Sequence, residues 1–365
     1  MYILDKMDTG KKYFTKQLLQ WNKTQNKRAM PWKGEKDPYK IWLSEIILQQ
    51  TRVEQGWAYY NRFVSRFPNI KKLAAAPEEK VFKLWEGLGY YTRCKNLIAT
   101  AKFISNEKQG KFPDSYEEIL SLKGIGPYTA AAIASFAFNL PHAVVDGNVF
   151  RVLSRFFGID TPIDSSTGKN LFTALAEALL DKKLPGIYNQ AIMDFGAVIC
   201  KPQNPLCSAC PFKARCTALL EGKVDVLPVK TGKLIKKQRW LYYLIVAFNG
   251  KIYVRKRGPK EIWENLYEFV LLETNQSFSL SEIKNSKLFR NIAGKNKATI
   301  LHVSEMYKQQ LTHQTIKGNF IQLTVNNEPP LKDDKAVTYK QLKKLPFPKF
   351  ITAYLAENEV KAFAG

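Results

Sequence analysis

Apolar residues recur at spacings of three and four along the first part of the chain, up to about residue 222, which predicts helices. The stretches PYKIWLSEIILQQTRV and EEKVFKLWEGLGYY show this period. Two helix starts are also visible. Ser115 with Glu118 has the sequence of a capping box, and Pro77 followed by two acids fits the first turn of a helix. This part of the chain is therefore predicted to be mainly α-helical.

The pattern changes from about residue 240, where runs of β-branched and aromatic residues replace the helical period. Two such runs flank Asn249-Gly250, the strongest short signal for a β-hairpin. A helix is expected at about 279–290, and further strands at about 300–303 and 316–325. We therefore expect a second, smaller domain of the α+β class.

A basic segment with little helical periodicity lies between the two parts, and it is predicted to be an interdomain linker. Such a segment either follows an anionic partner or is simply solvated, and the pattern does not choose between the two. The predicted division is a helical domain at residues 1–222, a linker at 223–239 and the α+β domain at 240–365.

Charge narrows the class of partner. The 365 residues include 56 Lys and Arg against 32 Asp and Glu, a formal charge of +24, which favours a polyanion such as nucleic acid or an anionic membrane. No apolar run approaches the roughly 20 residues that span a bilayer, and the first residues do not resemble a signal peptide. We expect a cytoplasmic, nucleoid-associated protein.

Four of the five cysteines lie close together, and they are Cys200, Cys207, Cys210 and Cys216. The cytoplasm keeps thiols reduced, so disulfides are not expected here. Common zinc modules use two separate short knuckles, whereas this loop has one CxxC and several prolines. Four thiolates from one loop suit an iron–sulfur cubane, and zinc remains the alternative. The fifth cysteine, Cys94, is expected to be a small buried residue.

A glycine-rich turn joins two predicted helices in the stretch LKGIGPYT. Gly124 and Gly126 allow a tight hairpin, and the amides beside Lys123 and at the next helix start would bind a phosphate oxygen. This is the pattern of a helix–hairpin–helix, which grips the DNA backbone without reading sequence. An ordinary corner between two helices is the alternative.

Two acids are candidates for chemistry. Glu45 lies in an otherwise apolar helix, where burial would raise its pKa and suit a general acid near neutral pH. A surface glutamate on a half-buried helix is the alternative. Asp146, in VDGNV, either faces a ligand from a loop edge or only caps the next helix. The aromatic pair Tyr90 and Tyr91 could likewise stack on bases or belong to the core.

Taken together, the hairpin, the VDGNV aspartate and the C-x6-C-x2-C-x5-C spacing resemble the endonuclease III-like DNA glycosylases. Within that superfamily, SEIILQQTRVEQG, LGYYTRCKNL, VDGNVFRVLSR and YNQAIMDFGAVIC are similar to the MutY-type adenine DNA glycosylases. The resemblance covers residues from about 10 to 350. It implies a helical glycosylase domain with a 4Fe–4S cluster on the four clustered cysteines, followed by a Nudix-like α+β domain.

The resemblance also implies an activity, the removal of adenine mispaired with 8-oxoguanine (or guanine) in double-stranded DNA by acid-assisted hydrolysis of the N-glycosidic bond. It implies a monomer with no membrane partner. Glu45 would protonate the flipped adenine, and Asp146 would stabilise the positive sugar. Asn148 and Tyr128 would support them. Unlike the strand-nicking members, which carry a lysine at this place, the chain has Tyr128, so a monofunctional glycosylase is expected.

The remaining roles that the resemblance implies concern binding. Gln50 and Tyr90 would wedge the duplex, and Lys123, Gly124 and Gly126 would contact its backbone. Arg28, Trp32 and Gln190 would lie at the adenine pocket. Thr312 and His313 would sense 8-oxoguanine. Two alternatives stand. Within the superfamily, the chain is an endonuclease III-like glycosylase for oxidised pyrimidines, against which Tyr128 and the second domain argue; from another class, it is a DNA-binding module without catalysis.

Overall fold

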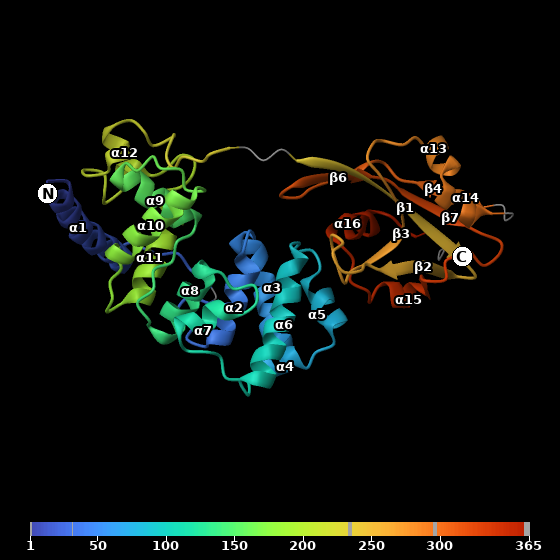
Figure 1. The fold of residues 1–365 in the computed structure, drawn as a ribbon, viewed down its shortest axis with the longest axis horizontal. Helices are drawn as coiled ribbons and strands as arrows, with labels where there is room; N and C mark the ends of the chain where they lie inside the picture. Colours follow the sequence, from blue (N-terminus) through green and yellow to red (C-terminus); the bar gives the residue numbers. More distant parts are fainter. Residues whose placement is uncertain (1, 31, 233–235, 295–297, 361–365) are drawn as a thin grey trace. The chain divides into compact units, whose positions relative to one another are not determined.

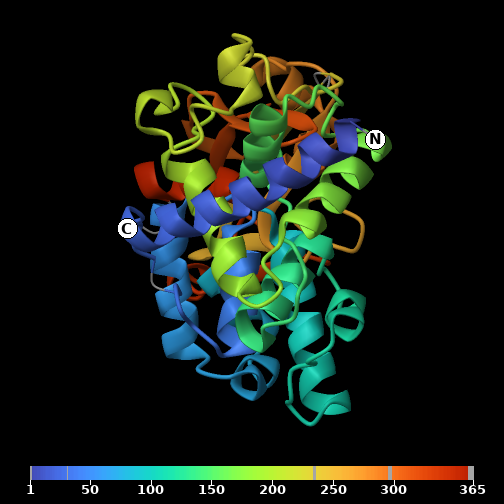
Figure 2. The same cartoon turned by 90° about the vertical axis from the view of Figure 1, so that its left-hand side faces the viewer.

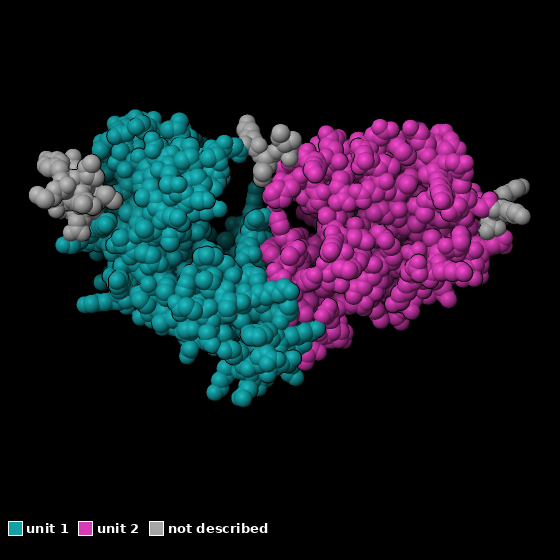
Figure 3. Space-filling view, viewed as in Figure 1, with its two compact units in different colours: residues 1–74, 99–232 teal, residues 75–98, 233–365 magenta. Residues whose placement is uncertain are grey.

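The computed structural model describes residues 2–30, 32–232, 236–294 and 298–360. The chain forms two compact units, Met1–Ala74 with Ala99–Gly232, and Ala75–Ile98 with Lys233–Gly365 (Figure 3). The three-part division expected from the sequence stays a prediction. Residues 233–235 of its linker and 361–365 of its last domain lie outside the described residues.

The first unit is helical, as the apolar periodicity predicts. Its helices are α1 (Tyr2–Thr24), α2 (Pro38–Leu48), α3 (Val53–Arg66), α4 (Ile70–Ala74), the end of α6 (Tyr91–Glu107), α7 (Tyr116–Ser121), α8 (Pro127–Phe138), α9 (Gly147–Phe157), α10 (Ser166–Leu179), α11 (Pro185–Val198), η1 (Cys207–Ala209) and α12 (Thr217–Leu220). Helix α11 contacts α1, α8 and α9, and α2 packs on α8 (Figure 1). Helix α1 lies across α10 and α11 (Figure 2).

Aromatic packing joins α1 to the cysteine-rich loop. Phe14 of α1 stacks on Phe212 with ring centroids 4.7 Å apart, and Phe195 of α11 meets the same ring edge-on at 5.0 Å. All three rings are almost fully buried. The loop that carries the cysteines is therefore part of the core of this unit rather than an appendage.

Two helix starts differ in detail from the expectation. Ser115 caps α7 by accepting from the N–H of Glu118, but the Glu118 carboxylate pairs with Lys108 at 2.7 Å, so only half of the capping box is formed. Pro77 is the N-cap of α5 (Glu78–Trp85), one position before the first turn. Neither difference moves a helix boundary by more than a residue, which is the usual uncertainty.

The first half of the predicted linker is held on the first unit. The N–H of Ile163 donates to the carbonyl of Val229 at 3.1 Å, and the Thr231 hydroxyl donates to Asp164 at 2.9 Å. Strand β1 begins at Lys237.

The second unit contains α5, the start of α6 and a mixed sheet. Its other elements are β1 (Lys237–Phe248), β2 (Lys251–Lys256), β3 (Tyr267–Thr274), α13 (Leu280–Asn285), α14 (Lys287–Ala293), β4 (Thr299–Val303), β5 (Tyr307–Gln310), β6 (Gln314–Gly318), β7 (Phe320–Thr324), β8 (Lys335–Val337), α15 (Tyr339–Leu342) and α16 (Lys349–Glu357). The described strands form one eight-stranded sheet, in which β1 runs parallel to β6 and β7 and antiparallel to β2 and β3.

Both faces of β1 are covered, which explains why its sequence is apolar at nearly every position instead of alternating. Tyr243 and Ile245 pack in a core with α15 and α16, whereas Tyr242 and Leu244 pack in a core with α13 and α14. The predicted hairpin is confirmed: β1 and β2 pair on either side of Asn249-Gly250, with φ of 48° and 67° at these residues.

Two expected elements are each divided in the structure. The helix predicted at about 279–290 is two short helices, α13 and α14, because Ser286 ends one and caps the other by accepting from Phe289. The strand predicted at about 316–325 is two strands, β6 and β7, interrupted at Asn319.

In the described part of the chain, no helix combines the length and the apolar character needed to cross a membrane.

Candidate active site

Glu45 is buried in the first unit. It lies on α2, in a run of residues that are almost all buried, and only 6% of its surface is exposed. Burial raises the pKa of Glu45 to about 7; a hydrogen bond with Tyr128 acts in the opposite direction, and the negative charge of Asp146 adds to the rise. Glu45 is therefore a buried acid and not the exposed helix residue that was the alternative.

Asp146 is the N-cap of α9 and is half-buried. Its Oδ1 accepts from the N–H groups of Asn148 at 2.9 Å and Val149 at 2.8 Å, and its Oδ2 accepts from the Asn148 side chain at 2.8 Å. The two interpretations of this residue are compatible, because the carboxylate that caps the helix also acts electrostatically on Glu45. Three N–H donors fix the position of its negative charge.

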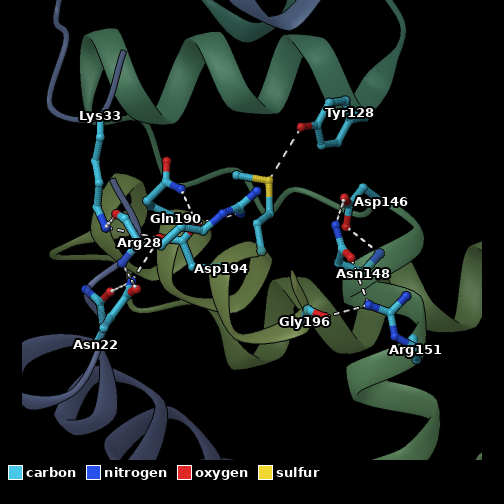
Figure 4. A network of polar contacts seen from close by, with 12 residues as sticks. Asn22, Arg28, Lys33, Tyr128, Asp146, Asn148, Arg151, Gln190, Asp194 and Gly196 are labelled. Carbon is cyan, nitrogen blue, oxygen red and sulfur yellow. Dashed lines mark hydrogen bonds and ion pairs between the residues drawn. The ribbon is translucent and has the colours of Figure 1, made fainter. Parts of the chain in front are cut away.

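Tyr128, in the first turn of α8, completes this group. Its hydroxyl donates to Met193 Sδ at 3.4 Å (Figure 4) and also interacts with the Glu45 carboxyl. Burial and the nearby charges of Glu45 and Asp146 raise the pKa of Tyr128 well above its usual value, so the phenol is a neutral donor. The fold thus brings together side chains from α2, α8 and the start of α9.

A buried arginine continues the network from Asn148, and the sequence analysis missed it. Arg151 donates through Nη2 to Asn148 Oδ1 at 2.8 Å and to the Gly196 carbonyl at 2.7 Å (Figure 4). Its Nε donates to the carbonyl of Cys200 at 2.7 Å. Helix α9 is therefore fastened both to α11 and to the start of the cysteine-rich loop.

A cavity of about 250 Å³ opens beside Glu45. Trp32 and Gln190, both predicted for a base pocket, line it together with Lys33. Trp32 is buried and packs edge-on against Tyr60, with centroids 5.4 Å apart. These side chains offer a flat apolar surface and polar groups near Glu45, with Glu35 as a second acid in the lining, which is the composition of a small-molecule pocket.

Arg28, also predicted for the pocket, is absent from this cavity lining but belongs to the same network. It donates to Asp194 Oδ1 at 2.9 Å, and Gln190 donates to the same oxygen at 2.9 Å (Figure 4). Asp194 is fully buried. Sequence reasoning missed it, although a lone acid in the apolar stretch NQAIMDFGAVI is the same signal that singled out Glu45.

The predicted helix–hairpin–helix has the expected local geometry. Gly124 has a φ of 80°, which favours glycine, and Gly126 is the N-cap of α8 without a side chain to cap it. The first-turn N–H groups of α8 can therefore donate to a bound anion, with the exposed Lys123 beside them and Ile125 buried beneath.

The two predicted wedge residues share an unusual backbone. Gln50 after α2 and Tyr90 before α6 are exposed, with φ of 56° and 47°, in the left-handed region that non-glycine residues rarely adopt. The two residues of the aromatic pair differ in burial: Tyr91 is buried in the core, whereas Tyr90 is 47% exposed and available for stacking. Within the second unit, the Tyr90 hydroxyl lies 3.3 Å from Thr312 Oγ1. Thr312 and His313 are exposed between β5 and β6.

The clustered cysteines surround one small cavity. All four line a space of about 30 Å³, and all are free and partly buried. Burial raises the pKa of Cys210 to about 12, so a bound cation would be needed to hold it as a thiolate. Among the described residues, no group of three or more His, Cys, Asp or Glu side chains is placed to hold a metal ion.

The fifth cysteine, Cys94, is fully buried, as expected.

Comparison with known proteins assigns the two parts of the chain. Residues 43–177 match the family described as "HhH-GPD superfamily base excision DNA repair protein", and residues 241–357 match the NUDIX domain. A solved structure of a thermostable thymine-DNA glycosylase superposes with a TM-score of 0.55 at 29% identity, covering 59% of this chain and 98% of the other.

Curated relatives extend over most of the sequence. The adenine DNA glycosylase of Buchnera aphidicola subsp. Baizongia pistaciae is 36% identical over 316 residues, which is 86% of each chain. The adenine DNA glycosylase of Homo sapiens is 41% identical over 214 residues, covering 56% of this chain and 39% of the relative.

Proposed function

Since the chain belongs to the adenine DNA glycosylase family, and is thus an enzyme that removes adenine by hydrolysing an N-glycosyl bond, we propose that it acts on adenine opposite 8-oxoguanine. The interaction of Tyr128 and Asp146 with Glu45, which itself lines the cavity, is the observation that carries the residue roles. The alternative of a DNA-binding module without catalysis would not need a buried acid there.

The chemistry follows from the two acids. Adenine is a poor leaving group as an anion, so protonation by Glu45 lowers the barrier to its departure. A carboxylate at Asp146 stabilises the positive charge that develops on the sugar, as the paired carboxylates of glycosidases do. The protein keeps the two roles apart because burial raises the pKa of Glu45, while Asp146 accepts three hydrogen bonds.

The pH dependence of excision should report the raised pKa of Glu45. The active form is the protonated one, so the single-turnover rate is expected to be high below about pH 7 and to fall as pH rises through that value, about tenfold per unit. Excision would be measured on one duplex from roughly pH 6 to pH 9, with DNA binding followed in parallel. A rate that stays constant or increases over this range would contradict the assignment.

We also propose that the enzyme is monofunctional. Tyr128 stands where the strand-nicking relatives carry a lysine, and its neutral phenol cannot form a Schiff base with the sugar. Borohydride is therefore expected to trap no efficient covalent adduct with DNA, and the product should be an intact strand with an abasic site. A bifunctional endonuclease III treated in the same way is the positive control.

Selectivity for 8-oxoguanine is assigned to the second unit. The exposed Thr312 and His313 lie on one loop, and Thr312 lies next to the exposed Tyr90, so a sensing group and a wedging aromatic side chain are close together. The test compares adenine excision opposite 8-oxoguanine, guanine and thymine, with Thr312→Val as a variant of equal size. Equal rates on all three duplexes in the unaltered protein would refute the proposed target.

The four clustered cysteines are proposed to hold a 4Fe–4S cluster. The four thiols line one cavity, and four cysteines are the ligand set of this group, which would stiffen the loop that carries Lys201, Lys213 and Arg215 for contact with phosphates. The purified protein is expected to be brown and to contain iron and acid-labile sulfide in equal amounts. Zinc without sulfide would overturn the assignment.

We further propose that the protein is a monomer and that it works at the nucleoid.

A further inference from the structure

Asp194 of α11 lies at the centre of a network of hydrogen bonds beside the cavity (Figure 4). Its Oδ1 accepts from Arg28 and Gln190, both at 2.9 Å. Its Oδ2 accepts from Asn26 at 2.8 Å and from Lys33 at 3.1 Å. The carboxylate is fully buried, whereas the donors come from the segment after α1 and from the preceding turn of α11.

All four partners approach Asp194 with N–H groups. Arg28 and Lys33 have no acceptor atom, so both oxygens of Asp194 accept, Oδ1 from Arg28 and Oδ2 from Lys33, which is the role of a carboxylate. Two of the partners, Arg28 and Lys33, are cationic and compensate the buried negative charge. Removing that charge would leave Arg28 and Lys33, whose side chains are 23% and 32% exposed, without their counter-charge.

The contact also decides which way the Gln190 amide points. Its Nε2 must face Asp194, because a carboxylate cannot donate to the amide oxygen. The Gln190 oxygen then points to the other side, away from Asp194 (Figure 4). Gln190 lines the cavity beside Glu45, so the group it can present there is an acceptor. An exocyclic amino group, as in adenine, supplies the matching donor.

We propose that Asp194, held in place by Arg28 and Lys33, is a positioning residue that fixes the Gln190 amide, so that the pocket prefers a purine bearing an amino group. This inference rests on the proposed assignment of the cavity as the base pocket. Asp194 touches no base itself and acts through Gln190. A site built around one fixed acceptor discriminates strongly against a base that lacks the donor, because the acceptor is then left unpaired.

The test compares two bases in two proteins. Single-turnover excision is measured for adenine and for purine, which has hydrogen in place of the amino group, each opposite guanine. In Asp194→Asn, the new amide can donate to Gln190 and let its amide turn over. The preference for adenine over purine is expected to fall about tenfold. Differences in leaving-group chemistry cancel, because the same bases are used with both proteins. Asp160→Asn, at an exposed position, is the matched control and should keep the preference.

A purely structural role gives a different result, in which both rates fall by the same factor and the preference is unchanged; that result would overturn the inference. Should Asp194→Asn fail to fold, Gln190→Leu removes the same acceptor and must lose the preference in the same way. Glu45→Gln in the same assay tests the assignment of the cavity as the base pocket separately from the role of Asp194. If it excised both bases at the unaltered rates, the pocket assignment itself would be wrong, whatever the Asp194 variants did.

Discussion

Replacing Glu45 by glutamine is expected to lower the rate of adenine excision by about a hundredfold to ten-thousandfold, the usual contribution of a general acid. Glutamine has nearly the same shape and can keep a hydrogen bond with the Tyr128 hydroxyl, but it has no acidic proton to give to the base. The fold should persist, because the substitution removes a buried acid without leaving a cavity. The rise of the Glu45 pKa to about 7 shows that burial disfavours its charged form.

The measurement is single-turnover excision with saturating enzyme, accompanied by binding to a duplex with an uncleavable adenine analogue. We expect binding to stay close to that of the unaltered protein while excision is lost. Glu107→Gln, at an exposed position of α6, is the matched control and should change neither quantity. Unchanged excision by Glu45→Gln would remove Glu45 from the reaction and refute the catalytic assignment.

Replacing Asp146 by asparagine is the second change with a large expected effect, a decrease in excision of about a hundredfold to a thousandfold. Asparagine is as good an N-cap as aspartate, so α9 should keep its start, while the negative charge beneath the sugar is lost. The rate would fall at every pH, because the substitution removes stabilisation of the oxocarbenium-like transition state and leaves the acid in place. Loss of the Asp146 charge should also lower the pKa of Glu45.

Asp181→Asn distinguishes loss of charge from loss of a cap. Asp181 also accepts two backbone N–H groups with one oxygen, those of Lys183 and Leu184 at 2.9 and 3.1 Å, but, unlike the charge of Asp146, its charge does not contribute to the raised pKa of Glu45. We expect this variant to excise adenine normally. If Asp146→Asn and Asp181→Asn reduced excision to the same small extent, Asp146 would be only a cap.

Local structure was predictable because its signals lie within a few residues. The hairpin at Asn249-Gly250 depends on two adjacent residues that tolerate positive φ, and the cap of α7 depends on Ser115 and an amide three residues later. The expectations failed where local signals competed. Ser286 looked like an interior helix position but instead caps a new helix, which divides the predicted one.

The candidate site could be predicted only in part. The resemblance pointed to Glu45, Asp146 and Tyr128, but only the fold shows that their side chains interact. Burial separates Tyr90 from Tyr91, although the two have the same chemistry and adjacent positions. Asp194 was missed because three of its four partners, Asn26, Arg28 and Lys33, lie more than 160 residues away along the chain.

The sequence by itself determined the helical and β halves of this protein, its hairpins, the set of thiols and the strongly basic charge, because each follows from neighbouring residues or from composition. The tertiary structure alone decided that Glu45 is buried, that Tyr90 is exposed and that Asp194 accepts four hydrogen bonds. Desolvation and electrostatic coupling depend on everything within a few ångströms in space. The atoms that meet there come from segments that no local pattern connects.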